Sequence, residues 1–145
     1  MSDSNFYTLK GYQIKNNSII TNSMEDYVEM IYRYNNDFIS VKKLSNLLNI
    51  KPSSASKMCS KLKELNLINF EKYGEISLTN NGKKLGEKLL IRHEILEKFL
   101  KYINKDNFKL EQVEKIEHFI DDITLENINK FLQKKAIKLL IKNIF

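Results

Sequence analysis

The stretch VKKLSNLLNIKPSSASKMCSKLKEL, residues 41–65, decides the fold that this sequence predicts. Ser40 suits a helix N-cap, and apolar residues at helical spacing follow it at Val41, Leu44, Leu47 and Leu48. Asn49-Ile50-Lys51 then breaks the helix, and Pro52 fits the first position of a second one. Two short helices joined by a tight turn form a helix-turn-helix, so we predict one here.

The second helix of this pair has an apolar side and a polar side. Its predicted buried seam consists of Ala55, Met58, Leu62 and Leu65, with Cys59 beside it as a small core residue. On the other face, small hydroxyls allow close approach to DNA and lysines can neutralise phosphates. We therefore predict DNA contacts from Ser53, Ser54, Ser56, Lys57, Ser60 and Lys61.

Two short apolar segments, 67–70 and 75–78, flank Lys72-Tyr73-Gly74 and predict a β-hairpin. A hairpin after the second helix extends the motif to a winged helix-turn-helix. The side chains of Lys72 and Tyr73 at its tip are predicted to reach the DNA backbone.

Further helices are predicted on both sides of this unit. Before it, Ser23 is the expected N-cap of a helix over about 24–35, with Asp26 at its capping-box position. After it, Thr79 is expected to cap a long helix at about 81–103, and Thr124 to cap the last one. The fold class is thus mainly α, with a small hairpin and a following all-α dimerisation domain.

We expect three parts in the chain: an N-terminal arm at 1–22, a winged DNA-binding domain at 23–80 and a helical domain at 81–145. The arm is compatible with a short strand or an ordered tail. The apolar surface of the helical domain is large for its size, so we expect it to form a twofold homodimer.

Charge is distributed unevenly along the 145 residues, whose formal net charge is +6. Lysine outnumbers arginine 22 to 2, which resembles codon bias and makes total basicity weak evidence for nucleic acid. Residues 41–64, however, hold six lysines against one acid, whereas residues 106–126 hold seven acids against two lysines. The first segment suits phosphates and the second suits cations.

Other classes of protein are disfavoured by what the sequence contains. A single cysteine argues against a disulfide framework and a thiolate zinc cluster. No apolar run approaches the ~18 residues of a membrane span, and Met1-Ser2-Asp3-Ser4 does not begin a signal peptide. We expect a cytoplasmic protein with no membrane contact and no organic cofactor.

The acidic segment contains Glu114-Lys115-Ile116-Glu117-His118. If it is helical, Glu114, Glu117 and His118 stand at i, i+3 and i+4 and share one face, as ligands of a divalent cation would. A solvated helix face explains the same pattern. Three further residues that could bind a metal ion also have simpler structural explanations. Asp26 can cap its own helix, Glu29 can pair with Arg33, and His93 can be a core residue.

Five stretches together resemble the diphtheria-toxin-repressor family, in its manganese-responsive branch. They are SMEDYVEMIY at 23–32, KPSSASKM at 51–58, LTNNGKK at 78–84, RHE at 92–94 and VEKIEH at 113–118. The resemblance covers about 23–132. It implies a homodimeric repressor in which divalent metal, bound between the two domains, holds the recognition helices at operator spacing.

The resemblance also implies a ligand set, at the positions of Asp26, Glu29, His93, Glu114, Glu117 and His118. The iron-responsive branch has a methionine and a cysteine where this chain has Asp26 and Glu114. Four carboxylates and two imidazoles without sulfur suit Mn²⁺, and the bridging carboxylates are compatible with two ions per subunit. We expect a Mn²⁺-responsive repressor of metal-uptake genes, with Fe²⁺ as the alternative.

Two rival interpretations remain. Di-iron and di-manganese oxidases need Glu-x-x-His on each of two helices, but Leu90 precedes His93 and Lys115 precedes His118 at that spacing. We therefore predict no enzyme activity. The second rival is a winged-helix regulator that binds no metal.

Overall fold

The computed structural model describes residues 7–16 and 19–145 and is mainly helical. Seven α-helices, two single-turn 3₁₀ helices and one two-stranded hairpin make up these ranges. In chain order they are α1 Leu9–Asn16, α2 Asn22–Arg33, α3 Val41–Leu48, α4 Pro52–Glu64, β1 Ile68–Asn69, β2 Ser77–Leu78, α5 Asn80–Asn104, η1 Lys105–Asn107, α6 Leu110–Ile116, η2 Glu117–Phe119 and α7 Asp122–Ile144.

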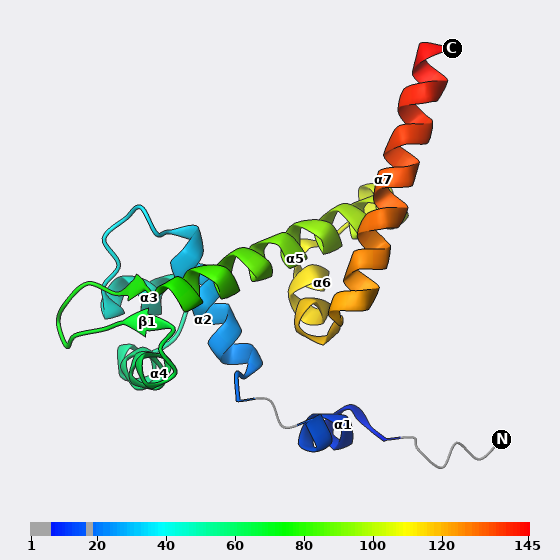
Figure 1. The fold of residues 1–145 in the computed structure, drawn as a ribbon. Coiled ribbons are helices and arrows are strands. Elements are labelled where there is room, and N and C mark those ends of the chain that lie inside the picture. The colour runs from blue at the N-terminus through cyan, green and yellow to red at the C-terminus, as the bar shows by residue number, and fades with distance from the viewer. Residues whose placement is uncertain (1–6, 17–18) are drawn as a thin grey trace.

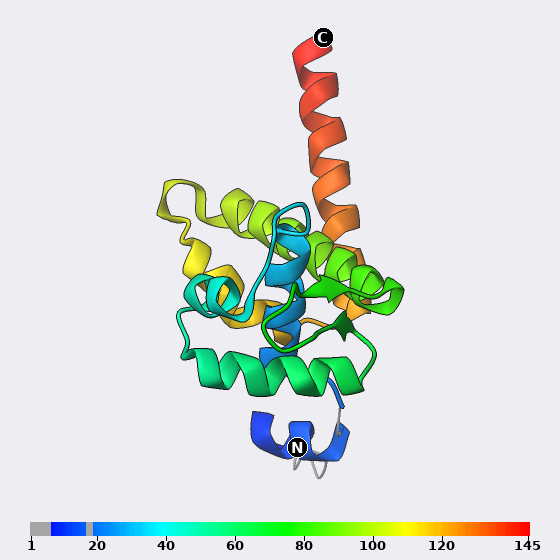
Figure 2. The ribbon, with the colours of Figure 1, turned by 90° about the vertical axis from the view of Figure 1, so that its left-hand side faces the viewer.

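The winged helix-turn-helix is confirmed, in the part of the molecule that holds α2, α3, α4 and the hairpin (Figure 1). Ser40 caps α3 by accepting a hydrogen bond from the backbone N–H of Lys43 at 3.1 Å. Asn49 ends α3 in the left-handed conformation, with φ 54°, and Pro52 opens α4. The antiparallel wing pairs Ile68 with Leu78. Figure 2 shows α4 lengthwise, along the lower side of this unit.

Several helix ends differ from the sequence predictions. Thr21, not Ser23, caps α2, because the Thr21 hydroxyl accepts from the Met24 N–H at 3.2 Å. Asp121, not Thr124, caps α7 by accepting from the Thr124 N–H at 2.6 Å. In both cases a polar side chain two or three residues earlier supplies the acceptor, and Ser, Thr and Asp serve about equally well as caps.

The N-terminal arm and the acidic segment also differ from expectation. Residues 9–16 form the helix α1 rather than a short strand, and residues 1–6 and 17–18 of the predicted arm lie outside the described residues. The continuous helix expected through His118 ends at Ile116. Glu117 and His118 instead lie in the single 3₁₀ turn η2, which changes the direction in which both side chains point.

The long helix α5 joins two hydrophobic cores. Its first half contributes Leu89 to the core of the winged unit, which also contains Val28, Leu44 and Leu62. Its second half contributes Leu96 and Leu100 to a smaller core with Val113 and Leu125 from α6 and α7. Figure 1 shows α5 running from the winged unit to the helices beyond it. The two parts of the molecule are therefore built on one continuous helix.

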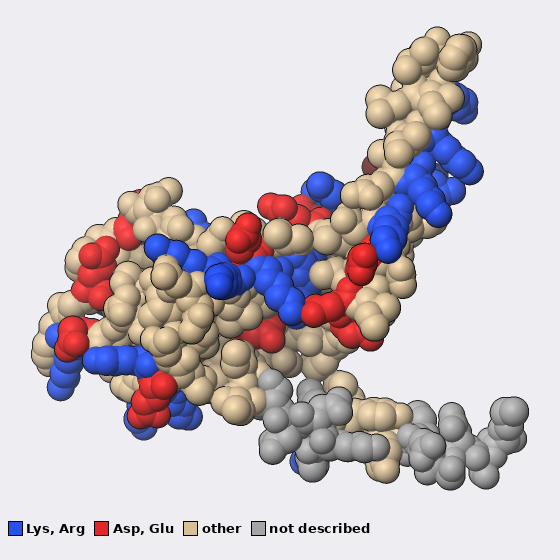
Figure 3. Space-filling model, in the orientation of Figure 1, with Lys and Arg blue, Asp and Glu red and all other residues tan. Residues whose placement is uncertain are grey.

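The last turns of α7 extend away from both cores (Figure 1). They expose large apolar side chains, namely Ile137, Leu139, Leu140, Ile141, Ile144 and Phe145. Lysines follow another side of the same helix (Figure 3), at positions 130, 134, 138 and 142. These side chains are part of the apolar surface of the helical domain, which the sequence analysis expects a dimer to cover. Among the described residues, none of the helices has the length and apolarity needed to cross a lipid bilayer.

Two glycines let α5 approach its neighbours closely. A Cβ at Gly86 would lie 2.6 Å from the Cβ of Tyr32 on α2, and one at Gly82 would overlap the carbonyl oxygen of Leu67. Both glycines are buried. The crossing of α2 over α5 therefore depends on the absence of a side chain at Gly86, and the approach of α5 to the wing depends on its absence at Gly82.

We predict that Gly82→Ala lowers the free energy of unfolding by about 1–3 kcal/mol, because the backbone carbonyl of Leu67 cannot move aside as a flexible side chain can. Urea denaturation of the variant and of Lys84→Ala, an exposed position on the same helix, checks this. Equal stabilities of Gly82→Ala and the wild type would show that the close approach is not needed.

Candidate metal centre and DNA-binding face

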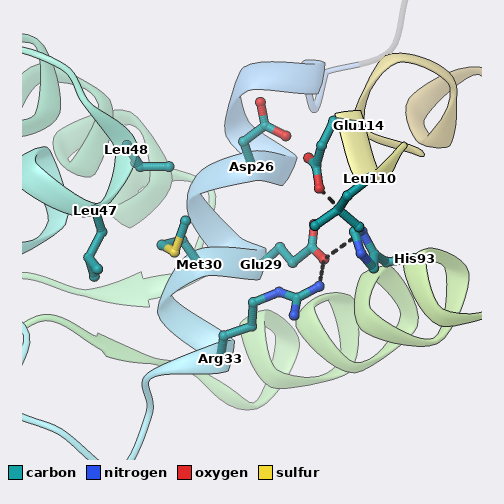
Figure 4. A pocket seen from close by; sticks show the side chains of 9 residues that line it. All are labelled: Asp26, Glu29, Met30, Arg33, Leu47, Leu48, His93, Leu110 and Glu114. Atoms are coloured by element: carbon teal, nitrogen blue, oxygen red, sulfur yellow. Dashed lines mark hydrogen bonds and ion pairs between the residues drawn. The ribbon is translucent and has the colours of Figure 1, made fainter. Parts of the chain in front are cut away.

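The structure brings all six side chains predicted as metal ligands together, where α2 faces α5, α6 and η2. Four of them, Asp26, Glu29, His93 and Glu114, appear in Figure 4. The first two extend from α2, His93 from α5 and Glu114 from α6. The pocket that these four residues line has a volume of about 340 Å³. Residues separated by up to 92 positions in the sequence thus meet at one site.

Two groups of potential ligand atoms can be distinguished in this site. Asp26, Glu117 and His118 form one, and Glu29, His93 and Glu117 form the other. Within each group the ligand atoms lie within 4.8 Å of one another. Glu117 belongs to both groups, and its side chain is only 3% exposed. The shared carboxylate makes the two groups parts of one centre.

His118 is held by acidic side chains of α2. Its Nε2 lies 2.7 Å from an Asp26 oxygen and its Nδ1 lies 3.0 Å from a Glu25 oxygen. These hydrogen bonds, to Asp26 first and then to Glu25, raise the pKa of His118 to about 10. In the metal-free protein the imidazole is therefore protonated at neutral pH and must lose a proton before it can bind a metal ion.

His93 is surrounded by carboxylates. Its Nδ1 lies 3.0 Å from Glu117 Oε2, 3.4 Å from Glu114 Oε1 and 3.9 Å from Glu29 Oε1. The hydrogen bond to Glu117 raises the pKa of His93. Partial burial, followed by repulsion from Glu117, raises the pKa of Glu114 to about 7. Burial likewise raises the pKa of Glu29. The centre thus combines four carboxylates with two imidazoles, and burial makes the carboxylic acids of Glu29 and Glu114 harder to ionise.

One buried atom indicates that this centre suits a cation. The Oε1 atom of Glu117 is buried and accepts no hydrogen bond from any described residue. The Nε2 atom of His118 lies 3.7 Å from it, which is too far for a hydrogen bond. A buried carboxylate oxygen without a hydrogen bond is costly, and coordination of a metal ion would satisfy it. Carboxylate oxygens with imidazole nitrogens are also a donor set that divalent first-row metals accept. The residues present therefore fit a divalent cation.

The sequence predictions missed Glu25 and Arg92. Arg92 is buried and donates from Nη1 to the backbone carbonyl of Glu117 at 3.0 Å, with Glu25 Oε2 3.4 Å from the same nitrogen. Glu25 and Glu29 stand four residues apart on α2 and share a face. This spacing could have identified Glu25 as a further side chain at the site. The expected pair of Glu29 with Arg33 is present at 2.8 Å, in addition to the contact of Glu29 with His93.

The face predicted to contact DNA is exposed on α4. Ser53, Ser54, Lys57, Ser60 and Lys61 are exposed and Ser56 is half-buried, whereas Ala55, Cys59 and Leu62 are buried as expected. At the tip of the wing, Tyr73 is 93% exposed and has a φ of 65°. The Nζ of Lys72 lies 5.4 Å from the centre of the Tyr73 ring. A polar helix face and an exposed basic tip are thus available to a ligand outside the protein.

Two family models match consecutive parts of the chain. Residues 20–76 match the N-terminal DNA-binding domain of the iron-dependent repressors, and residues 79–138 match their metal-binding and dimerisation domain. The chain belongs to the iron-dependent repressor family. This is the family of the diphtheria-toxin repressor, which the sequence resembles, and its members are DNA-binding transcriptional regulators rather than enzymes.

Solved structures of other regulators have the same fold. The manganese regulator SloR is 29% identical, with a TM-score of 0.66, and a manganese-dependent transcriptional repressor in complex with manganese is 26% identical, with a TM-score of 0.67. Each alignment covers 76% of this chain, and 53% and 52% of the respective relative. This chain thus spans about half the length of those two proteins. The hypothetical protein SSo2273 from Sulfolobus solfataricus is 25% identical with a TM-score of 0.62, and the alignment covers 79% of this chain and 90% of that one.

We predict that the contacts of His118 make stability depend on pH in the metal-free protein. Since the pKa of His118 is raised, the stabilisation is complete below the ordinary value of 6.5 and disappears as the pH rises towards about 10. His118→Gln should therefore lower the free energy of unfolding strongly at about pH 6 and little at about pH 10, as measured by urea denaturation.

The control for this experiment is Glu126→Gln, which removes one side of a surface pair with Lys130 on α7. The free energy of unfolding of this variant should equal that of the wild type at both pH values. A loss of stability from His118→Gln that is the same at both pH values would contradict the assignment of the ion pairs.

Proposed function

We propose that this chain is a Mn²⁺-responsive, DNA-binding repressor of metal-uptake genes that acts as a homodimer. The observation that carries the proposal is the position of the candidate metal centre. Asp26 and Glu29 come from α2 of the DNA-binding domain, whereas His93, Glu114, Glu117 and His118 come from the metal-binding and dimerisation domain. A cation held by both sets of side chains would fix one domain relative to the other.

The donor set supports manganese over later transition metals. It consists of four carboxylates and two imidazoles, and oxygen-rich sets suit Mn²⁺ whereas thiolates and thioethers select softer ions. The thioether of Met30 lines the same pocket, but it leaves α2 towards Leu47 and Leu48, on the side opposite to Glu29 (Figure 4). The only cysteine, Cys59, lies in the core of the winged unit. Fe²⁺ remains the alternative metal.

The carboxylate of Glu117, which both groups of ligand atoms share, indicates how many ions one subunit would bind. Glu117 contributes to both groups of ligand atoms, so we propose that two ions per subunit share it. Glu114, whose side chain is 54% exposed, lies beside the group that contains His93. This half-exposed carboxylate would complete that group from the solvent side.

The response to metal can be described as a change in the populations of the protein's conformations, caused by the charges of its own residues. When no cation is bound, the ion pairs of His118 and Arg92 hold α2 near η2, but the carboxylates in excess of these basic groups repel one another and weaken the assembled arrangement. A divalent ion supplies the positive charge that offsets this repulsion. The assembled arrangement then becomes the dominant one, with α4 and the wing of each subunit held at a fixed position relative to α7. In the dimer, that position sets the spacing of the two recognition helices.

Separate exposed surfaces are available for the proposed contacts with DNA and with a second copy of the chain. The exposed hydroxyls and lysines of α4 would face the major groove, and Lys72 and Tyr73 would contact the backbone. The exposed apolar side chains at the end of α7 would pack against a second copy. A metal-independent winged-helix regulator would use the same DNA face, so the response to metal is the property to test.

We predict that Asp26→Ala and Glu117→Ala each abolish Mn²⁺-dependent DNA binding and leave the fold intact. Each variant removes a carboxylate from one side of the domain boundary. Gel shifts on a duplex selected by the wild-type protein in the presence of Mn²⁺ test this, with circular dichroism to check folding. Glu126→Ala, an exposed position on α7, is the control. Metal-dependent binding that is unchanged in either variant would refute the proposal.

The lysines of α4 should instead govern how DNA binding responds to salt. Lys57→Gln or Lys61→Gln should weaken binding to every duplex and reduce the slope of log affinity against log salt by about 0.9 for each phosphate that the protein no longer neutralises. Fluorescence anisotropy across a salt series measures the slope, and Lys130→Gln on α7 is the matched control. If the slope stayed at its wild-type value in both α4 variants, DNA would lie on another face.

A further inference from the structure

Arginine occurs at two positions in this chain, 33 and 92, against 22 lysines. Both guanidinium groups contact carboxylates at the candidate metal centre. In a chain that uses lysine almost everywhere else, this placement indicates a need for the guanidinium group itself. A guanidinium is planar, stays charged at any physiological pH and offers several N–H donors in a fixed geometry, which an ammonium does not.

Arg92 connects the two sides of the domain boundary. It extends from α5, its side chain is 9% exposed, and Nη1 reaches both the Glu117 carbonyl in η2 and the Glu25 carboxylate in α2. Since it binds the backbone of Glu117, it leaves the side-chain carboxylate of that residue free for other partners. Glu25 also contacts His118, so a chain of charged hydrogen bonds runs from α5 through α2 to η2.

Arg33 holds one of the candidate ligands directly. Its Nη2 lies 2.8 Å from Glu29 Oε1, the same oxygen that lies 3.9 Å from His93 Nδ1. Figure 4 shows the Arg33 side chain reaching Glu29, which lies between it and His93. The Arg33 side chain is 36% exposed, so it can swing into solvent without opening the core.

We infer that the two arginines are positioning residues, built-in cations that hold the carboxylates of the centre in place before a metal ion arrives. Arg92 is the fixed member, because it is buried and binds atoms that need not change partner. Arg33 is the displaceable member, because it binds a carboxylate oxygen that faces the second ligand group. The part concerning Arg33 rests on the proposed function, whereas the part concerning Arg92 holds for the metal-free chain alone.

The two residues therefore have opposite effects on metal binding. Arg92 keeps α2 and η2 close in the absence of metal, which reduces the reorganisation needed on binding. Arg33 competes with the ion for Glu29 and places a positive charge beside it. Removing Arg33 should tighten binding, while removing Arg92 should loosen the metal-free domain boundary.

The test of Arg92 needs no metal. Hydrogen–deuterium exchange of the metal-free full chain should show that Arg92→Met speeds exchange about tenfold or more in peptides covering α2 and η2 and leaves the α4 peptides unchanged. Lys88→Met is the matched control, because Lys88 lies one turn earlier on α5 and pairs with the exposed Asp122. If Arg92→Met fails to fold, Glu25→Ala removes one of its acceptors and should speed exchange in the same peptides. Unchanged exchange in the folded variant would overturn the role of Arg92.

The test of Arg33 is the affinity for Mn²⁺ alone, measured by calorimetry or by the electron paramagnetic resonance of the free ion. Arg33→Gln should bind Mn²⁺ on the order of tenfold more tightly than the wild type, because one charge-assisted hydrogen bond no longer competes for Glu29. Lys43→Gln, at a surface pair with Asp37, is the control. Equal or weaker binding by Arg33→Gln would overturn the role of Arg33, whereas a wild type that binds no Mn²⁺ would refute the proposed function.

Discussion

The main physical constraint in this molecule is the cluster of carboxylates at the boundary between α2 and η2. Each of six carboxylates here lies within 3.9 Å of one or more of four basic groups, those of His93, His118, Arg33 and Arg92. The carboxylates belong to Glu25, Asp26, Glu29, Glu97, Glu114 and Glu117. Carboxylates that lie close together and are partly shielded from water repel one another. This repulsion opposes the approach of α2 to η2. The packing of α2 against α5 and the contacts of Arg92 and His118 hold the two segments together, and a bound cation would offset the repulsion that remains between the carboxylates.

The rest of the fold positions these charges. Gly82 and Gly86 let α5 pass close to the wing and to α2, and α5 continues into the second core. The same helix therefore supports His93 and Arg92 in the site and Leu96 and Leu100 beyond it. Because α2, α4 and the first half of α5 share one core, the ligands on α2 have a fixed position relative to the DNA face of α4. The candidate metal centre and the DNA face are linked through the cores, without direct contact between them.

Sequence periodicity was sufficient for the winged helix-turn-helix, since leucines at helical spacing, Ser40 and Pro52 all specify local structure. It failed at helix ends, where Thr21 and Asp121 replaced the predicted caps, because neighbouring Ser, Thr and Asp side chains cap with similar free energies. It also failed at Glu117, because the break from α-helix to 3₁₀ turn depends on tertiary contacts such as that of Arg92 with its carbonyl. The six ligand positions followed from the family resemblance. The roles of Glu25 and Arg92 needed the spatial arrangement, since nothing local distinguishes a buried arginine on α5 from an exposed lysine.

Anomalous scattering from a crystal of the full chain soaked in Mn²⁺ tests most directly whether a cation joins the two domains. We expect anomalous density at the two groups of ligand atoms that share Glu117, bounded by Asp26 and Glu29 on one side and by His93 and His118 on the other. Anomalous density confined to surface carboxylates, or within one domain only, would contradict a metal ion that bridges the domains. The protein would then be a winged-helix regulator whose acidic centre serves another purpose.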